Sequence, residues 1–319
     1  MDAEAEAEDS EEMEEAAAGS EDGPRWATQD SGIVWCDSAE ALLEAVADGQ
    51  FQIEIGACEA MEPVLAAVEQ VAGQLQSVMF CGCKLNDAAF ARIGTALAST
   101  RVKGVGISNN PDVGLEAWAA LWVRLPASVV KWDFGDNSLP DEALPRLMEA
   151  LKESKAQELF LDGNQLTNIS PLLSLVADSL ELTELDLGDN SIPDEQVKRL
   201  AEEALPGCSL TTLVLGRNPI SDVAGKPLAY ALARTDIDTL HLEETQVGDA
   251  TLDALVDVLT NTKLVELHLD GTKISNDGAL RLCKELPQSK ITCLDIGDNG
   301  LSDETVAAIE AAIPDVTMA

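Results

Sequence analysis

The feature that most constrains this chain is a segment that recurs with a period of about 27 residues. Copies of the form apolar-x-x-apolar-x-apolar-x-x-Asn/Cys/Thr start at Leu75, Val102, Val129, Ala156, Leu182, Leu210, Ile237, Leu264 and Ile291, and no interval departs from that period by more than a single position. So regular a period predicts a solenoid, in which each unit covers the hydrophobic face of its neighbour. A degenerate copy over 52–58 precedes them, and 33–35 suggests an irregular first strand.

The first half of each unit has the pattern of a short strand. Apolar residues alternate with polar ones, as at Leu240 and Leu242, which places the apolar side chains on one face. The ninth place then carries a small side chain that can hydrogen-bond backbone in a turn: Cys58, Cys83, Asn110, Asn137, Asn164, Asn190, Asn218, Thr245, Thr272 and Asn299. We expect this column to form a buried ladder that satisfies loop amides.

The second half of each unit has the pattern of a helix. Twelve places after the start stands a residue of the type that caps helix N-termini: Asp87, Asp141, Asp194, Asp222, Asp249, Asn276 and Asp303, with Gly114 and Asn168 in the other two copies. Parallel strands joined by helices cross over right-handed, and helices about 10 Å wide over strands about 4.8 Å apart bend the stack. The predicted fold class is an α/β solenoid of about ten repeats, a horseshoe with a parallel β-sheet on the concave face and α-helices on the convex face.

The repeat resembles that of a known family. The segments Leu185-Asp186-Leu187-Gly188-Asp189-Asn190-Ser191-Ile192 and Leu213-Val214-Leu215-Gly216-Arg217-Asn218-Pro219-Ile220 resemble the leucine-rich repeat, and the resemblance covers about residues 50–313. The length of the period and the helical second half are similar to the ribonuclease-inhibitor-like subfamily. Its members are curved solenoids that bind other proteins, so the resemblance implies a non-enzymatic binding module or scaffold.

Three segments are expected. Residues 1–23 hold eleven acids and no base, which predicts a disordered acidic tail. Residues 24–49, with Trp26, Trp35 and a helical run over 39–46, are expected to cap the first repeat, and 50–319 form the solenoid. At the far end, Val316 and Met318 are expected to fold over the open edge, the alternative being that this edge contacts another subunit.

Charge excludes several classes of function. The chain has 58 acidic and 20 basic residues and a formal charge of −38, so nucleic acid or an anionic membrane would meet a repulsive field. No apolar run approaches the roughly 20 residues of a membrane span, and the N-terminus is acidic where a secretory signal would be basic. Seven cysteines without a Cys-x-x-Cys pair are expected to be reduced thiols. The expected location is the cytoplasm or, alternatively, the nucleus.

The third, fifth and seventh places of each unit are expected to face outward on the concave side, where a partner would bind. The expected partner-binding residues are Asp133, Glu158, Phe160, Asp162, Glu184, Asp186, Val214, Arg217, His241, Glu243, His268, Asp270 and Asp295. Phe160 and Val214 are apolar in a polar strip, so we expect them to be contact anchors. The acids indicate a protein partner with a basic surface, although the face could equally share the acidity of the whole chain.

The two histidines of the chain, His241 and His268, fall in the same column of consecutive units, which places their rings about 5 Å apart. Glu243, Glu266, Asp270 and Asp295 lie close in the pattern. Three interpretations stay open: a divalent-metal site, a pH-sensitive patch and plain surface. Because a flat sheet face lacks convergent geometry, the sequence assigns no metal and no cofactor.

No catalytic residue is assigned either. The sequence contains no phosphate-binding, zinc-protease or nucleophile-elbow motif, and Cys81 has no base beside it, so we expect no enzymatic activity. One alternative is a regulator of a small GTPase that resembles Ran GTPase activators, for which Lys84 and Arg217 are the nearest basic candidates. A second alternative is an acidic histone-type chaperone that acts through residues 1–23.

Overall fold

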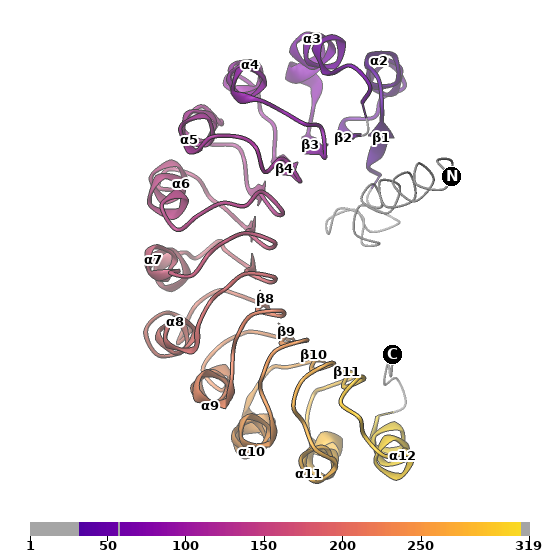
Figure 1. Ribbon diagram of the computed structural model, residues 1–319, viewed down its shortest axis with the longest axis vertical. Helices are drawn as coiled ribbons and strands as arrows, with labels where there is room; N and C mark the ends of the chain where they lie inside the picture. The colour runs from indigo at the N-terminus through magenta and orange to yellow at the C-terminus, as the bar shows by residue number, and fades with distance from the viewer. Residues whose placement is uncertain (1–31, 57, 314–319) are drawn as a thin grey trace, which may run out of the picture.

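The strands form one continuous parallel sheet. The computed structural model describes residues 32–313 apart from residue 57, and in this part of the chain eleven strands follow one another in chain order, β1 to β11. Every strand is parallel to its neighbours. The strands line the inside of an arc and the helices its outside (Figure 1). This confirms the predicted α/β solenoid.

The strands and helices alternate along the described chain. The strands are β1 (Val34–Cys36), β2 (Gln52–Gly56), β3 (Ser77–Cys81), β4 (Gly104–Ser108), β5 (Lys131–Asp133), β6 (Glu158–Phe160), β7 (Glu184–Asp186), β8 (Thr212–Val214), β9 (Thr239–His241), β10 (Glu266–His268) and β11 (Cys293–Asp295). The helices are α2 (Ala39–Ala47), α3 (Met61–Val71), α4 (Asp87–Leu97), α5 (Leu115–Trp122), α6 (Ala143–Leu151), α7 (Leu173–Asp178), α8 (Asp194–Arg199), α9 (Asp222–Leu232), α10 (Asp249–Val258), α11 (Asn276–Glu285) and α12 (Asp303–Ala312).

Seven of the ten ninth-place residues are buried, and the other three, Cys58, Thr272 and Asn299, are half-buried, so the predicted ladder is buried over most of its length. The side-chain amide of Asn164 donates from Nδ2 to three backbone carbonyls, including that of Phe134 in the preceding repeat at 3.0 Å. Its Oδ1 accepts from the backbone N–H groups of Asn137 at 3.2 Å and Leu139 at 2.8 Å. Because one amide both donates and accepts, each asparagine fixes its own turn and the turn before it. The thiol of Cys83 makes only the donor half of this pattern, to Ile55 O at 3.1 Å.

The prediction that the aspartates at the helix starts are N-caps is wrong by one residue for several helices. Helices α9 and α10 begin at Asp222 and Asp249, and the caps are the preceding Ser221 and Gly248. The Asp249 carboxylate instead accepts from the backbone N–H and the hydroxyl of Ser275 in the next repeat, at 2.8 and 2.6 Å. The same bridge recurs from Asp87, Asp141, Asp194, Asp222 and Asn276 to the following unit. Each of these side chains therefore joins neighbouring repeats rather than closing its own helix.

The core runs through the whole stack between sheet and helices. Its bulkiest part is an aromatic cluster, in which Trp118 contacts Phe90 with ring centroids 4.7 Å apart and Phe134 at 5.3 Å. At the N-terminal end, β1 and α2 occupy the predicted cap, and Trp35 is 51% exposed. The predicted tail 1–23, Trp26, Val316 and Met318 lie outside the described residues. No helix in the described part combines the length and apolar character that a bilayer crossing requires.

Candidate functional site

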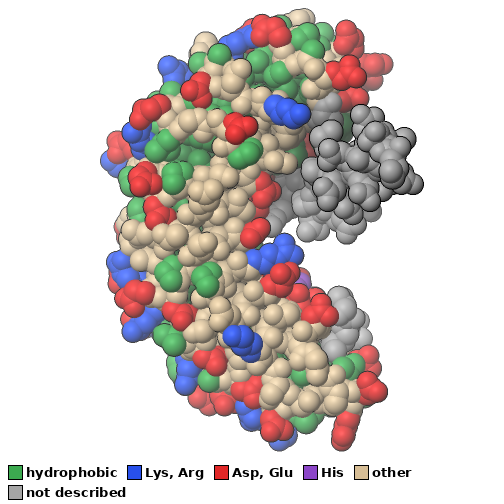
Figure 2. Space-filling view, in the orientation of Figure 1, with side chains coloured by type: hydrophobic (Ala, Val, Ile, Leu, Met, Phe, Trp, Pro, Cys, Tyr) green, Lys and Arg blue, Asp and Glu red, His purple; other side chains and the backbone are tan. Residues whose placement is uncertain are grey.

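The predicted columns exist on the concave side of the sheet. Pairing between strands places Asp133, Phe160, Asp186, Val214 and His241 in one unbroken row, followed by His268 and Asp295. Lys131, Glu158 and Glu184 form the parallel row two residues earlier. We call the third, fifth and seventh places of the units with strands β2–β11 the concave face. Figure 2 shows acidic side chains gathered along this inner edge of the arc, with a histidine beside them.

The fifth-place side chains in the middle of the concave face are buried, whereas those towards its C-terminal end are partly exposed to solvent. Asp133, Phe160 and Asp186 are buried, with 7%, 3% and 1% exposure, whereas Val214 and His241 are half-buried. The expectation that Phe160 is an accessible anchor is therefore corrected. Phe160 pairs with Asp133 and Asp186 on the two adjacent strands. Asp162 is buried as well, at 8%.

Some of the acids serve the fold. Asp133, Asp186 and Asp295 each accept a hydrogen bond from the backbone N–H two residues later, at 3.2, 2.8 and 3.1 Å. All three start the sequence Asp-x-Gly-Asp-Asn, at 133–137, 186–190 and 295–299. The carboxylate ends the strand by turning the backbone toward the ladder, as aspartate does in local turns. This motif is the sequence signal that separates these aspartates from acids that only face outward.

Sequence reasoning missed the eighth place of the unit. In nine successive units this residue has a left-handed backbone, with φ between 47° and 59°: Gly82, Asn109, Asp136, Gly163, Asp189, Arg217, Glu244, Gly271 and Asp298. We call these nine residues the rim, since they follow the concave face in each unit. Glycine and asparagine favour this conformation, and their recurrence here was the available signal.

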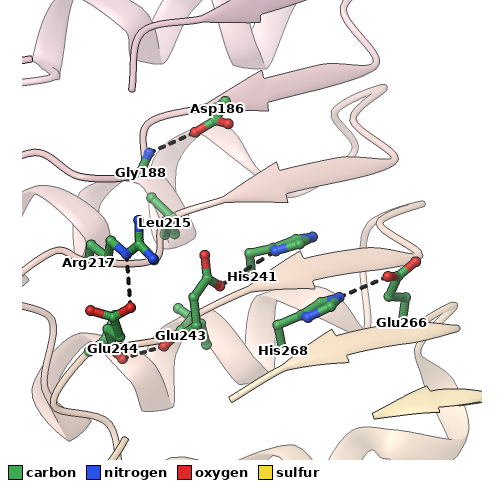
Figure 3. Close-up of polar contacts among 12 residues, drawn as sticks. Asp186, Gly188, Leu215, Arg217, His241, Glu243, Glu244, Glu266 and His268 are labelled. Atoms are coloured by element: carbon green, nitrogen blue, oxygen red, sulfur yellow. Dashed lines mark hydrogen bonds and ion pairs between the residues drawn. The ribbon is translucent and has the colours of Figure 1, made fainter. Parts of the chain in front are cut away.

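Arg217 lies on the rim and is paired. Its Nε is 3.0 Å from Glu244 Oε1, the rim residue of the next unit, in an exposed ion pair (Figure 3). Nearer the middle of the sheet, Lys131 Nζ is 2.6 Å from Glu158 Oε1 on the adjacent strand. These pairs leave the concave face with more acid than base.

The two histidines meet as the spacing predicts. Their rings are stacked with centroids 4.0 Å apart and planes 9° from parallel. His268 Nε2 is 2.8 Å from Glu266 Oε1, and His241 Nδ1 is 3.5 Å from Glu243 Oε2 (Figure 3). We call His241, Glu243, Glu266 and His268 the histidine cluster.

Charge is concentrated around this cluster. Burial and the neighbouring carboxylate of Asp295 raise the pKa of Asp270. Burial by itself would raise the pKa of Glu243, but the polar contact with His241 Nδ1, 3.5 Å away, and the charge of that ring outweigh it and lower that pKa. The crowding of carboxylates means that this end of the concave face favours any cation that approaches.

The thiols of Cys81 and Cys83, on and beside the concave face, are not activated. Burial is the main cause that raises the pKa of Cys83, to about 12, and burial also raises the pKa of Cys81. Since the thiolate is the nucleophilic form, neither sulfur is prepared for covalent chemistry at neutral pH.

Comparison with known proteins agrees with this geometry. The family described as "Leucine Rich repeat" matches residues 208–229, 260–283 and 288–309, three stretches that include strands β8, β10 and β11. These three stretches are leucine-rich repeats. A chain in the crystal structure of the yeast Rad7 and Elc1 complex has the same fold, with a TM-score of 0.54 and 15% identity over 88% of this chain and 80% of that one.

A second solved structure is similar to this leucine-rich-repeat chain more distantly. An internalin (inlF) from Listeria monocytogenes gives a TM-score of 0.46 and 16% identity over 84% of this chain and 78% of that one. A search of curated protein sequences gives no match.

Proposed function

We propose that the solenoid is a non-enzymatic scaffold subunit that holds a protein partner with a basic surface along its concave face and rim. The observation that carries this proposal is the row of half-buried carboxylates at the C-terminal part of the concave face: Glu243, Glu266, Asp270 and Asp295. Lysine and arginine side chains of a partner would neutralise them. Glu158 and Glu184, half-buried on β6 and β7, extend the acidic row toward the middle.

One apolar side chain, that of Val214, lies among the polar residues of the concave face. Val214 is half-buried on β8, between Asp186 on one neighbouring strand and His241 on the other. A partner side chain packed on Val214 would be surrounded by polar groups, the arrangement in which interface anchors are effective. The charges around it would speed the encounter with a basic partner more than they tighten the complex.

The comparisons support the mode of action at the level of the fold. The structure of similar fold from yeast is described as a complex of Rad7 and Elc1. The repeat length and the helical convex side further support membership of the ribonuclease-inhibitor-like subfamily. We also propose that the chain is divided into an acidic tail at 1–23, an N-terminal cap at 24–49 and the solenoid at 50–319. The proposed location of the protein is the cytoplasm or the nucleus.

Charge reversal on the two sides of the sheet tests the proposal. Partners would be captured with the full chain and identified by mass spectrometry, and the dissociation constant would then be measured at low and at physiological salt. We expect the triple variant Glu184→Lys, Glu266→Lys, Asp270→Lys to bind at least tenfold more weakly and with a smaller salt dependence.

A matched control separates the concave face from overall charge. The convex variant Glu195→Lys, Glu202→Lys, Glu304→Lys changes the net charge by the same amount on exposed residues of α8, the π-helical segment that continues it and α12, and we expect it to bind within about twofold of the unchanged chain. Equal weakening by both variants, or affinity that does not change with salt, would contradict a concave acidic interface.

Two alternatives have distinct tests. As an activator of a small GTPase, the chain would have to release Arg217 from Glu244, and any Arg217-dependent acceleration of GTP hydrolysis would favour that function. For an acidic chaperone, removal of residues 1–23 would abolish binding to histones, whereas a concave interface would retain its partner.

A further inference from the structure

The histidine cluster has a geometry that partner binding does not explain. The geometry points to a binding site for one divalent transition-metal ion of the zinc class, formed by His241, His268 and Glu266, with Glu243 orienting His241. This inference goes beyond the proposed function, because it needs no protein partner, and the two share the carboxylates of Glu243 and Glu266.

The three ligand residues already converge. One ligand atom from each of His241, Glu266 and His268 can be chosen so that all three lie within 4.8 Å of one another. Zn–N and Zn–O bonds of about 2.0–2.2 Å in a tetrahedral site place ligand atoms about 3.3 Å apart, so side-chain rotations of modest size complete the set. The backbone needs no change, since Glu266 and His268 alternate on β10 and His241 pairs with His268 across the sheet.

The contacts of the two rings indicate which nitrogen of each would bind a metal. His241 Nδ1 faces Glu243, which leaves Nε2 as its remaining ligand atom. His268 Nε2 points at Glu266, 2.8 Å away, so an ion between them would replace the proton that they share (Figure 3). The stacked rings would rotate about their side-chain torsions until the two lone pairs converge on the ion.

Glu243 has the position of a residue that orients a metal ligand. Its carboxylate lies over Gly216, where an added Cβ would be 2.2 Å from Oε1. Its Oε2 is buried and accepts no hydrogen bond from the residues that the structure describes, with His241 Nδ1 3.5 Å away. A metal on Nε2 requires the proton on Nδ1, and that N–H would then donate to Glu243. Metal-bound histidines commonly have such a carboxylate partner.

The surroundings favour a cation with a preference for nitrogen. His268, Asp270 and Asp295 form a second set of ligand atoms within 4.8 Å of one another, so two further carboxylates adjoin the site. Their charge stabilises a divalent ion that the two imidazoles would otherwise hold alone. Two imidazole nitrogens select zinc, nickel, copper or cobalt over magnesium and calcium, which prefer oxygen ligands throughout.

The test uses the full chain freed of metal by a chelator and titrated with Zn²⁺ alone by calorimetry. We expect one ion per chain with a dissociation constant in the micromolar range or below. His241→Ala and His268→Ala should each weaken binding at least tenfold, and Glu243→Gln should weaken it by about 10- to 100-fold through loss of the orienting contact. Co²⁺ should show the visible absorption of a tetrahedral site, which a purely structural role of the histidines would not produce.

Glu184→Gln is the matched control for Glu266→Gln, since both glutamates occupy the third place of their units, three strands apart. Glu266→Gln should weaken Zn²⁺ binding, whereas Glu184→Gln should leave it unchanged. Circular dichroism would confirm that both variants are folded. Absence of binding at 100-fold molar excess, binding that survives both histidine substitutions, or equal losses from the two glutamine variants would overturn the site.

Discussion

Strands β2 to β4 and strands β8 to β11 lie at opposite ends of one sheet, yet strands of the first group span five residues each and those of the second three. At the N-terminal end the ladder position is filled by Cys58, Cys83 and then Asn110, and the concave places are mostly small or uncharged. At the C-terminal end the ladder consists of Asn and Thr, and the concave face carries acids and the histidine cluster. The register is the same at both ends, so the buried places of the unit specify the fold and leave the outward places free for function.

The largest expected effect on stability comes from the ladder, where replacing an asparagine should destabilise the chain more than replacing a cysteine. Asn164→Ala removes an amide that donates to three carbonyls and accepts from two N–H groups. We expect it to lower the free energy of unfolding by about 3 kcal/mol or more, because buried partners are left unsatisfied. Cys83→Ala, which loses a thiol donor, should cost about 1–2 kcal/mol. Chemical denaturation measures both, and equal losses would show that the thiol and the amide are equivalent in this ladder.

Two glycines in the seventh column test the packing of the concave face at each end. At Gly216 an added Cβ would be 2.2 Å from the Glu243 carboxylate, and at Gly56 it would be 2.2 Å from the Trp35 ring. We expect Gly216→Ala to destabilise the chain by about 1–2 kcal/mol, since a half-buried charged group must move. Gly56→Ala should cost less, because Trp35 is half-exposed and can turn into solvent. Thermal unfolding compares them, with Gly73→Ala as the control where the added atom meets nothing within 4 Å.

The bridges between repeats predict a pH dependence. Burial works to raise the pKa of Asp249, but hydrogen bonds from Ser275 outweigh it and hold that pKa below its usual value. A lowered folded-state pKa means that the stabilisation is present above the ordinary aspartate pKa of about 3.9 and is lost as the pH falls through the lower, folded-state value. Asp249→Ala should therefore cost about 1 kcal/mol at pH 7 and progressively less in acid, as measured by urea unfolding.

Asn276 is the matched control for this titration. It makes the equivalent bridge, accepting from the backbone N–H of Ser302 at 2.8 Å, but an amide does not ionise in this range. The cost of Asn276→Ala should stay constant between pH 7 and pH 3. A loss with acid at Asn276 equal to that at Asp249 would assign the effect to other carboxylates.

The smallest effect is expected on the rim. Arg217→Gly removes an exposed ion pair with Glu244, worth up to about 1 kcal/mol, and relieves a left-handed backbone of φ 55°, worth about 1 kcal/mol. Because the two contributions oppose each other, the free energy of unfolding should change by less than about 0.5 kcal/mol, as at an ordinary surface position. A decrease in the free energy of unfolding by clearly more than about 1 kcal/mol, the most that an exposed ion pair contributes, would show that Arg217 stabilises the fold.

Most of the fold was predictable because the period of the repeat fixes which residues share a column. Asn164 and the histidine pair lie where the spacing places them. The burial of Phe160 was not predictable, because the repeat pattern assigns a residue to the concave face but does not say how much of its side chain the surroundings cover. The role of Asp249 was missed because its local sequence is that of a cap, while its partner lies 26 residues further on.

The candidate site was predictable as a set of residues but not as a geometry. Register alone brings His241 beside His268, since consecutive units align the same place. It does not say that Glu243 folds over Gly216 or that Glu266 turns back to His268. These are choices of side-chain rotamer, which depend on the space that neighbours leave.

The bridges from each helix start to the next unit have a mechanical consequence. Each bridge connects only adjacent repeats, so a force that pulls the two ends of the arc apart acts on all the junctions in series. The extension of the whole arc is then the sum of the extensions at the individual junctions. Gly114 has no side chain to make such a bridge, and Asn168 turns back to Ser170 in its own unit. Under tension the arc should open first at these two junctions, as a chain of springs extends most at its softest members.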